Sequence, residues 1–218
     1  MPEYKAPLRD MRFLIDNVFD FHAHYAALGA TDASPDMVSA ILEEGAKFCE
    51  NVLAPLNRSG DEEGCHFDKG VVTTPKGFKE AFAQYVQGGW HGVAADPAYG
   101  GQGLPQSLGL VLSEMIGSSN TSWGMYPGLT HGAMSAIHAH GTDEQKATYL
   151  SKLTAGEWTG TMCLTEAHCG TDLGLIKTRA VPQADGSYAV SGSKIFISAG
   201  EHDLRDREER RVGKECME

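Results

Sequence analysis

The feature that most constrains the fold is a change of hydrophobic period at Ala155 and Gly156. Before this point apolar residues recur every three to four positions, and after it they alternate with polar residues. The first spacing places apolar side chains on one face of a helix, and the second places them on one face of a strand. We therefore expect an α+β protein, in which an N-terminal helical bundle domain is followed by the start of a β domain.

Four helices are predicted before this point, each from an apolar face with helical spacing. The first starts at Ser34 and Pro35, an N-cap and a first helical residue, and the fourth carries a capping box of Thr142 and Gln145. The helices are expected over residues 35–52, 75–87, 108–116 and 143–153, with a shorter one over residues 11–19.

The second part of the chain is predicted to form strands and then to lose all pattern. Segments rich in Thr, Val, Ile, Tyr and Phe predict strands, and Asp185-Gly186 is a hairpin signal between two of them. Ten of the fourteen residues in 205–218 are charged, so this tail is expected to be dispensable for folding. The strands are expected over residues 160–165, 174–182, 187–191 and 194–198.

Charge and composition exclude several classes of protein. The chain of 218 residues has 18 Lys and Arg against 29 Asp and Glu, a formal net charge of −11, which argues against nucleic acid as a partner. No run approaches the roughly 18 apolar residues of a membrane span. The five cysteines are odd in number and irregular in spacing, which is typical of reduced thiols. We therefore expect a soluble, cytoplasmic protein.

Most familiar catalytic motifs are absent from the sequence. Residues 100–106 read GGQGLPQ, which starts like a dinucleotide-binding turn but has Gln106 where the third glycine belongs. His131, His138 and His140 cluster without an acidic or Cys partner at metal-ligand spacing, so ordinary helix histidines are the better interpretation. A metal-dependent hydrolase using these histidines remains an outside alternative, and no metal ligand is predicted.

The most informative stretch is residues 162–174, which read MCLTEAHCGTDLG. A predicted strand ends there in hydroxyl and acidic residues and turns at Gly170. Such a loop can present N–H and hydroxyl donors together, which suits an electron-rich ring edge or a phosphate. From the residues alone, a simple turn capped by Thr and Asp side chains is the better explanation of the stretch.

Four spaced motifs resemble the acyl-CoA dehydrogenase family over about residues 36–204. Residues 164–172 (LTEAHCGTD) are similar to its L-T-E-x-x-x-G-[ST]-D signature, and residues 192–198 (GSKIFIS) to its G-x-K-x-[WF]-I-[TS] strand. Residues 89–104 resemble its glycine-rich turn, and residues 141–150 its G-T-x-x-Q-K-x-x-Y-L helix. Residues 4–11 and 168–174 further resemble the branch that includes 3-methylmercaptopropionyl-CoA dehydrogenases.

The resemblance implies an FAD-dependent oxidoreductase that acts on the α,β carbon–carbon bond of an acyl-CoA thioester. It implies a helical N-terminal domain (36–157) after an extension (1–35), and part of a β-barrel-like middle domain (158–204) before a tail foreign to the family (205–218). An electron acceptor such as an electron-transfer flavoprotein and a homo-oligomer are the implied partners. The residues that it places at the FAD are Met162, Leu164, Thr165, Gly170, Thr171, Phe196 and Ser198, with Thr171 also near the substrate.

Two departures from the family pattern are expected to matter. Cys169 and Leu175 replace small residues of the signature, so local packing is expected to differ. The catalytic glutamate of the family belongs to a later region than residue 204, so we expect a truncated chain that is inactive alone and has no catalytic residue of its own. Glu166 is expected to hydrogen-bond within its turn and not to act as a base. The alternative function is a non-catalytic acyl-CoA-binding or interaction module of the same fold.

Overall fold

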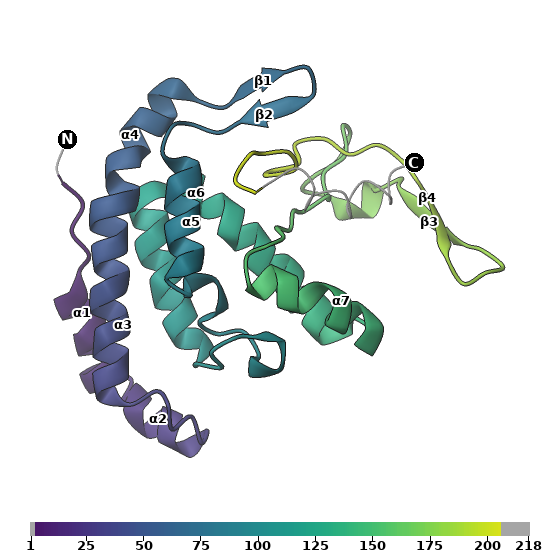
Figure 1. The fold of residues 1–218 in the computed structure, drawn as a ribbon. Coiled ribbons are helices and arrows are strands. Elements are labelled where there is room, and N and C mark those ends of the chain that lie inside the picture. The colour runs from purple at the N-terminus through teal and green to yellow at the C-terminus, as the bar shows by residue number, and fades with distance from the viewer. Residues whose placement is uncertain (1–2, 206–218) are drawn as a thin grey trace.

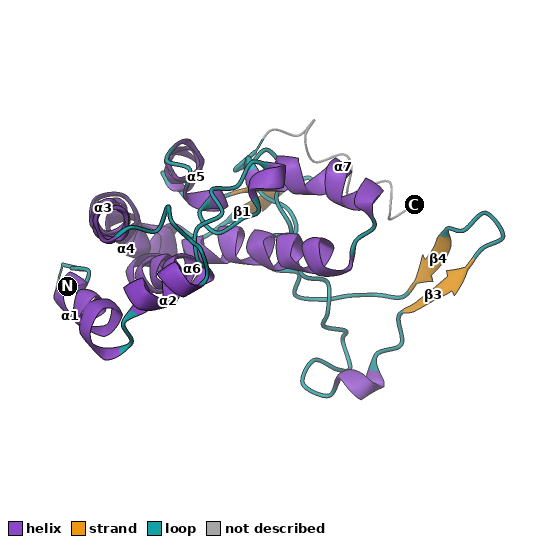
Figure 2. Ribbon diagram, turned by 90° about the horizontal axis from the view of Figure 1, so that it is seen from below, coloured by secondary structure: helices purple, strands orange, loops and turns teal. Residues whose placement is uncertain are grey.

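A computed structural model describes residues 3–205 of the chain (Figure 1). Helices make up most of it as far as residue 154, and the strands within the described range are two short antiparallel hairpins (Figure 2). The predicted α+β class is confirmed, and the described strands form no closed barrel. The helices are α1 (Leu8–Phe13), α2 (Phe21–Ala27), α3 (Pro35–Phe48), α4 (Ala54–Glu63), α5 (Phe78–Gln87), α6 (Gln106–His140) and α7 (Asp143–Thr154).

Helix α3 and its continuation extend further than the sequence predicts. The helix starts as expected, with the Ser34 hydroxyl accepting from the Met37 N–H at 3.3 Å and Pro35 in the first turn. It then passes through a π-helical turn, η2 (Cys49–Leu53), directly into α4. Pro55 does not stop the helix because it falls in the first turn of α4, where a missing N–H is tolerated. A second π turn, η1 (Leu14–Val18), follows α1 in the predicted N-terminal helical segment.

Helix α6 is 35 residues long and is broken at Asn120, whose backbone is extended (φ −159°, ψ 87°). The Asn120 carboxamide oxygen accepts from the Trp123 N–H at 3.0 Å, and its amide donates to the Leu53 carbonyl at 3.3 Å. Asn120 therefore caps the second half of α6 and ties it to the end of η2. The sequence predicts only the first half, residues 108–116.

Helices α5 and α7 form close to their predicted positions. The capping box of α7 is confirmed, because the Thr142 hydroxyl accepts from the Gln145 N–H at 3.2 Å and the Gln145 side chain accepts from the Thr142 N–H at 2.9 Å. Two 3-10 turns, η3 (Trp90–Gly92) and η4 (Pro97–Tyr99), lie between α5 and α6. Gly101 is required there, because a Cβ at this position would lie 2.0 Å from the Ala95 carbonyl oxygen.

One hydrophobic core fills the space between these helices. Trp123 is its largest fully buried side chain, and its indole N–H donates to the Phe78 carbonyl at 3.2 Å. A smaller cluster of Met134, Leu150 and Leu153 joins α6 to α7. The main core is built mostly from α3, η2, α5 and α6, with α1, η1 and α2 adding to it, and its fully buried members include Tyr25, Leu42, Leu53, Phe82, Tyr85, Leu108 and Met115. No described helix has an apolar stretch long enough to cross a bilayer.

The strand predictions are only half right. Strands β3 (Arg179–Pro182) and β4 (Tyr188–Ser191) pair as the hairpin that Asp185-Gly186 predicts, after a 3-10 turn, η5 (Leu173–Leu175). Residues 160–165 and 194–198 form no strand, because a single backbone bond, Ile195 N–H to the Thr165 carbonyl at 2.9 Å, replaces a ladder. The sequence also misses the hairpin of β1 (His66–Asp68) and β2 (Val71–Thr73).

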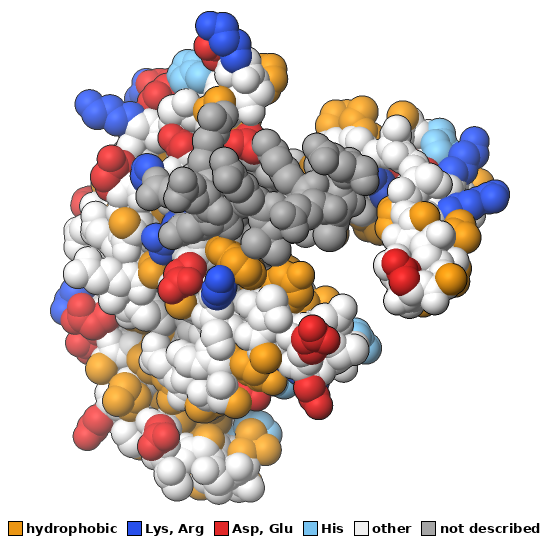
Figure 3. All heavy atoms as spheres, turned by 45° about the vertical axis from the view of Figure 1, so that its right-hand side comes forward, with side chains coloured by type: hydrophobic (Ala, Val, Ile, Leu, Met, Phe, Trp, Pro, Cys, Tyr) orange, Lys and Arg blue, Asp and Glu red, His pale blue; other side chains and the backbone are white. Residues whose placement is uncertain are grey.

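Residues 158–205 lie against the helical part at one end and project from it at the other. In Figures 1 and 2 the β3–β4 hairpin lies away from the helices, and in Figure 3 the projecting part carries hydrophobic side chains on its surface. Every residue of β3 and β4 is exposed. The predicted charged tail lies, from residue 206 onward, outside the described residues.

Candidate functional site

Two extended segments, residues 161–165 and 194–198, lie side by side and carry most of the predicted site. The Thr161 hydroxyl donates to the Ser198 carbonyl, and the Lys194 ammonium donates to the Leu164 carbonyl at 3.0 Å. Together with the bond between Ile195 and Thr165, these contacts hold the two segments together without a regular ladder. The structure therefore brings the two predicted groups of residues, which are about thirty positions apart in the chain, to one place.

Glu166 anchors the loop that follows the first segment. Its buried carboxylate accepts from the Thr178 hydroxyl at 2.6 Å, from the Lys177 N–H at 2.9 Å and from the Lys194 ammonium at 2.9 Å. The Thr178 hydroxyl, then the Lys177 N–H and the Lys194 ammonium, hold the pKa of Glu166 far below its ordinary value. A carboxylate so occupied cannot take a proton from a substrate. The expected structural role of Glu166 in this turn is confirmed.

The predicted site residues form an accessible face around these segments. Met162 and Phe196 expose 55% and 82% of their surface, while Leu164 and Thr165 are half-buried. Phe196 holds a left-handed backbone conformation with φ of 58°, which is unusual for a residue with a bulky side chain. The other predicted residues, Gly170, Thr171 and Ser198, are exposed.

This face has the chemistry that a flavin ring would need. Within residues 3–205, the N–H and hydroxyl of Thr165 and the hydroxyls of Thr171 and Ser198 have no hydrogen-bond partner. Free donors beside exposed apolar side chains suit a ring that is flat and apolar on its faces and rich in acceptors along one edge. The residues that are present therefore fit an FAD.

Glu166, His168 and Cys169 could in principle hold a metal ion, because one ligand atom from each lies within 4.8 Å of the others. However, the Lys194 ammonium occupies one Glu166 oxygen, and the Lys177 N–H occupies the other. The His168 Nε2 is 2.9 Å from the Leu175 carbonyl oxygen. A cation would have to displace these partners, so the geometry favours the loop as a hydrogen-bonded turn.

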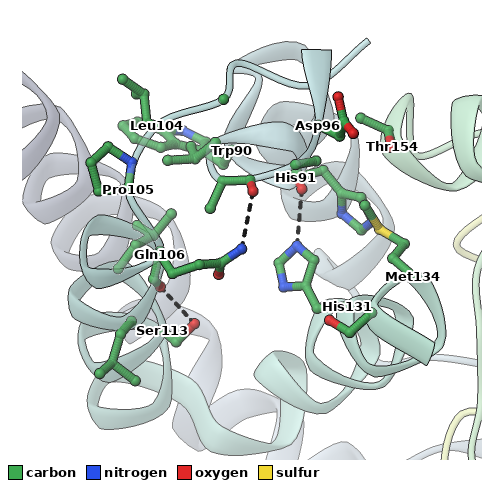
Figure 4. A pocket seen from close by; sticks show the side chains of 18 of the residues that line it. Trp90, His91, Asp96, Leu104, Pro105, Gln106, Ser113, His131, Met134 and Thr154 are labelled. Atoms are coloured by element: carbon green, nitrogen blue, oxygen red, sulfur yellow. Dashed lines mark hydrogen bonds between the residues drawn. The ribbon is translucent and has the colours of Figure 1, made fainter. Parts of the chain in front are cut away.

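A cavity of about 860 Å³ lies in the helical part, between the loop of η3 and η4 and helix α6 (Figure 4). The sequence does not predict it. Its walls are mostly apolar, and the polar side chains that reach it include His91, His131 and Ser113. The Gln106 amide donates to the Ala94 carbonyl at 3.1 Å and fixes the loop to the start of α6 (Figure 4). The apolar wall includes Tyr85, Trp90, Val93, Leu104, Leu112, Met134 and Leu150.

His91 and His131 lie next to each other beside this cavity, with ring centroids 5.0 Å apart and ring planes tilted by 43°. Burial, then the neighbouring His131 and Arg205, lower the pKa of His91 to about 3, and burial also lowers the pKa of His131. Both rings are therefore neutral at pH 7. Of the three histidines that the sequence singles out, His131 reaches the cavity wall, His138 lies at its rim beside Asp96, and His140 is exposed.

Comparison with known proteins identifies the class. The model of the acyl-CoA dehydrogenase N-terminal domain matches residues 36–157. The chain belongs to the acyl-CoA dehydrogenase family, which confirms the resemblance seen in the sequence. It is 43% identical over 203 residues, 93% of its length, to the 3-methylmercaptopropionyl-CoA dehydrogenase of Ruegeria pomeroyi, and covers 34% of that protein. The chain spans about a third of the length of the curated relatives that it matches.

Solved structures show the same fold. Butyryl-CoA dehydrogenase from Megasphaera elsdenii superposes with a TM-score of 0.63 at 26% identity, over 77% of this chain and 42% of that one. An acyl-CoA dehydrogenase from Bacillus anthracis complexed with FAD superposes with a TM-score of 0.61 at 24% identity, over 77% of this chain and 27% of that one. At this identity the second likeness concerns the fold alone.

Proposed function

We propose that this chain supplies the N-terminal part of an FAD-dependent acyl-CoA dehydrogenase that oxidises the α,β carbon–carbon bond of an acyl-CoA thioester. The observation that carries the proposal is the accessible face of the two paired segments, which includes the free donors of Thr165 and Ser198 and the exposed side chains of Met162 and Phe196. Membership of the family supports it, as does the 43% identity to the 3-methylmercaptopropionyl-CoA dehydrogenase of Ruegeria pomeroyi.

In this proposal the chain's residues hold and orient the cofactor. Leu164 and Thr165 offer N–H or hydroxyl donors to the ring edge, Ser198 offers a hydroxyl near the reacting nitrogen, and Met162 and Phe196 pack against the ring. Gly170 and Thr171 belong to the loop that contacts the cofactor, and Thr171 also contacts the CoA arm of the substrate. When bound, FAD supplies the acceptor for the β-hydride. Donors aimed at the ring stabilise the negative charge that arrives with the hydride.

The α-proton must go to a carboxylate that the described face does not offer. Glu166 is saturated by its own partners, and no other described carboxylate is among the predicted site residues. We propose that the base is contributed from outside this chain, together with further contacts to the cofactor. Turnover by residues 1–218 alone is therefore expected to be far below that of the complete enzyme, because the base and the positioning each contribute orders of magnitude.

The partners and the location of the protein stay proposals. An electron-transfer flavoprotein is the proposed electron acceptor, and the complete enzyme is proposed to be a homo-oligomer. The cytoplasmic location stays a prediction from the cysteine pattern. A second function, acyl-CoA binding without catalysis, is favoured by one observation, the large cavity in the helical part, which does not depend on the two extended segments.

A chimera tests these alternatives. Residues 1–204 would replace the aligned part of the Ruegeria relative, and the purified protein would be examined for colour and for acyl-CoA-dependent reduction of an artificial acceptor. A yellow, active protein is the expected result. A colourless protein that still binds acyl-CoA would favour the binding module, and a protein that binds neither FAD nor acyl-CoA would refute both.

A further inference from the structure

Lys194 makes two contacts that lie on either side of a proposed flavin donor. Its ammonium donates to the Leu164 carbonyl at 3.0 Å and to the Glu166 carboxylate at 2.9 Å, and its side chain is 20% exposed. Thr165 is the residue between these two acceptors, and its N–H has no partner within residues 3–205. One side chain from the second extended segment therefore holds the first segment immediately before and after Thr165.

The contact with Glu166 does not by itself require a lysine. Besides Lys194, the carboxylate accepts from the Thr178 hydroxyl at 2.6 Å, from the Thr178 N–H at 3.0 Å and from the Lys177 N–H at 2.9 Å. These three donors serve both carboxylate oxygens, and a carboxylate with two or three such donors stays ionised without a cation. The contact that they cannot replace is the one between Lys194 and the Leu164 carbonyl.

The Leu164 carbonyl and the Thr165 N–H belong to one peptide group. This group is planar and trans, so its carbonyl and its N–H point in opposite directions. An ammonium that holds the carbonyl therefore fixes the direction of the N–H and turns it away from Lys194. The carbonyl of the next peptide is fixed as well, because the Thr165 carbonyl accepts from the Ile195 N–H at 2.9 Å. Thr165 thus offers its free N–H from a backbone that is held on both sides.

The same contact makes the Thr165 N–H a stronger donor. Hydrogen bonds in series polarise one another, and a bond from a cation to a peptide carbonyl draws electron density away from the N–H of that peptide. The gain is largest toward an acceptor that becomes negatively charged. In the proposed function, that acceptor is the edge of the flavin ring, which gains negative charge when the hydride arrives.

We propose that Lys194 is a positioning residue that acts through the peptide between Leu164 and Thr165, directs its N–H to the ring edge of FAD, and favours binding of reduced over oxidised FAD. This inference rests on the proposed function and adds to it a residue that sets the electron affinity of the site. In this proposal Lys194 touches neither the ring nor the substrate, and it transfers no proton.

The first measurement tests the contact without FAD, on the chain of residues 1–218 labelled with 13C and 15N. In Lys194→Met, the NMR signals of the Leu164 carbonyl carbon and the Thr165 amide nitrogen are expected to move, because the carbonyl loses its donor. Lys177→Met is the matched control, since this exposed ammonium of the same loop has no partner among the described residues. Unchanged Leu164 and Thr165 signals in Lys194→Met would overturn the proposal.

The second measurement is the reduction potential of FAD in the chimera, obtained by equilibration with a reference dye without oxygen. The potential depends on the ratio of the affinities for reduced and oxidised FAD. Lys194→Met is expected to lower this ratio about tenfold, because the Thr165 donor loses its fixed direction and its polarisation. For a two-electron couple, a tenfold change corresponds to a fall of about 30 mV. A merely structural role would weaken both forms equally and leave the potential unchanged, as is expected for Lys177→Met.

Two further variants separate the charge from the side-chain stem. Lys194→Arg keeps a cationic donor and should retain most of the ratio, whereas Lys194→Gln keeps a neutral donor and should lower it about threefold. This comparison also decides the case in which the Met variant does not fold. Equal potentials in the Gln variant and the natural chimera, or a loss in Lys194→Arg as large as that in Lys194→Gln, would overturn the proposal.

These outcomes distinguish the inference from the proposed function. If the chimera is yellow and active but its potential does not depend on Lys194, the proposed function stands and this inference fails. If the natural chimera takes up no FAD, the proposed function fails, and the inference fails with it whatever the Leu164 signal shows.

Discussion

The helical region, residues 8–154, and the following segment, residues 158–205, differ in what holds each of them. Nearly all members of the main core come from the helical region, and Leu204 is the one that the later segment contributes. In that segment the hairpin of β3 and β4 is exposed along its whole length. The segment is held instead by hydrogen bonds, among them the Glu166 cluster and the bonds that join Asp203 to Thr74 and Gly160 to Thr130 in the helical region.

This difference teaches where the stability and the chemistry of the chain lie. Helices satisfy their backbone within themselves and need only one apolar face covered, so the helical region forms a core on its own. Strands need neighbours on both edges to complete their ladders. The segment that carries the proposed FAD contacts is thus the less buried one, and its variants should change stability less than variants in the helical region.

The largest expected difference in stability is between the alanine variants of two phenylalanines, one in each region. Phe82 is fully buried, and Phe82→Ala is expected to lower the free energy of unfolding by about 3–5 kcal/mol because it leaves a cavity in the core. Phe196→Ala, at 82% exposure, should change it by less than about 0.5 kcal/mol. Urea unfolding followed by tryptophan fluorescence measures both. Similar losses in the two variants would show that the segment packs as tightly as the helices.

Turnover should depend on the two regions in the opposite way to stability, with the larger losses in variants of the later segment. In the active chimera, Thr165→Val and Ser198→Ala are each expected to raise the barrier to turnover by roughly 2–4 kcal/mol, because each removes a donor aimed at the flavin edge. Their melting temperatures should change little. Thr178→Val is the matched control, since its hydroxyl is bound to Glu166 and its loss should reduce stability more than Thr165→Val does. Unchanged turnover in both Thr165→Val and Ser198→Ala would refute their proposed roles.

Removal of the hydrogen bonds that connect the two regions should reduce stability by an intermediate amount. One Asp203 oxygen accepts from the Thr74 N–H at 3.0 Å and from the Thr74 hydroxyl at 2.7 Å. Asp203→Ala is expected to cost about 2 kcal/mol, because Thr74 is buried and loses both partners. Asp185 makes the same two bonds to Ser187 in the exposed hairpin turn, so Asp185→Ala is the control that should leave the melting temperature nearly unchanged.

The smallest expected effect is a pH dependence of stability that arises from a histidine in the helical region. The pKa of His91 is lowered to about 3 from an ordinary 6.5, so between these values the unfolded chain binds a proton that the folded chain does not. Stability should therefore fall with falling pH by about 1 kcal/mol per unit below pH 6. His131, whose pKa is also lowered, acts in the same direction, and Arg205 lies nearby.

His91→Leu should flatten this dependence between pH 6 and 4.5, a range in which Glu166 stays ionised because its pKa is depressed. Thermal unfolding at several pH values gives the slope, with His140→Leu as the control. An unchanged slope in His91→Leu would assign the pH dependence to other groups.

The sequence predicts the helical region well wherever the signal is local. Ser34 with Pro35, and Thr142 with Gln145, mark helix starts through bonds between neighbouring residues, and both appear as expected. The second half of α6 was not predicted, because Pro127 and the glycines obscure the helical period there. The strand pattern of residues 194–198 failed because Phe196 and Ala199 adopt left-handed conformations, which period-two patterns do not reveal.

The candidate site also contains features that a local sequence pattern cannot reveal. The family signature places Thr165 and Ser198 in one site, and the structure brings their segments together. The sequence places His91 in a glycine-rich turn and predicts nothing further for it. Its lowered pKa depends on burial and on the nearby His131, which lies forty residues later in the chain. Long-range packing of that kind leaves no local trace in a single sequence.

The break in α6 at Asn120 also bears on how such a protein can evolve. In a continuous helix, the insertion or loss of one residue turns every later side chain by about 100° about the axis. Asn120 interrupts that dependence, because the second half starts afresh from its own cap. The half that packs on α3 can therefore keep its register while the half that carries Gly124, Gly128 and His131 changes length or lining.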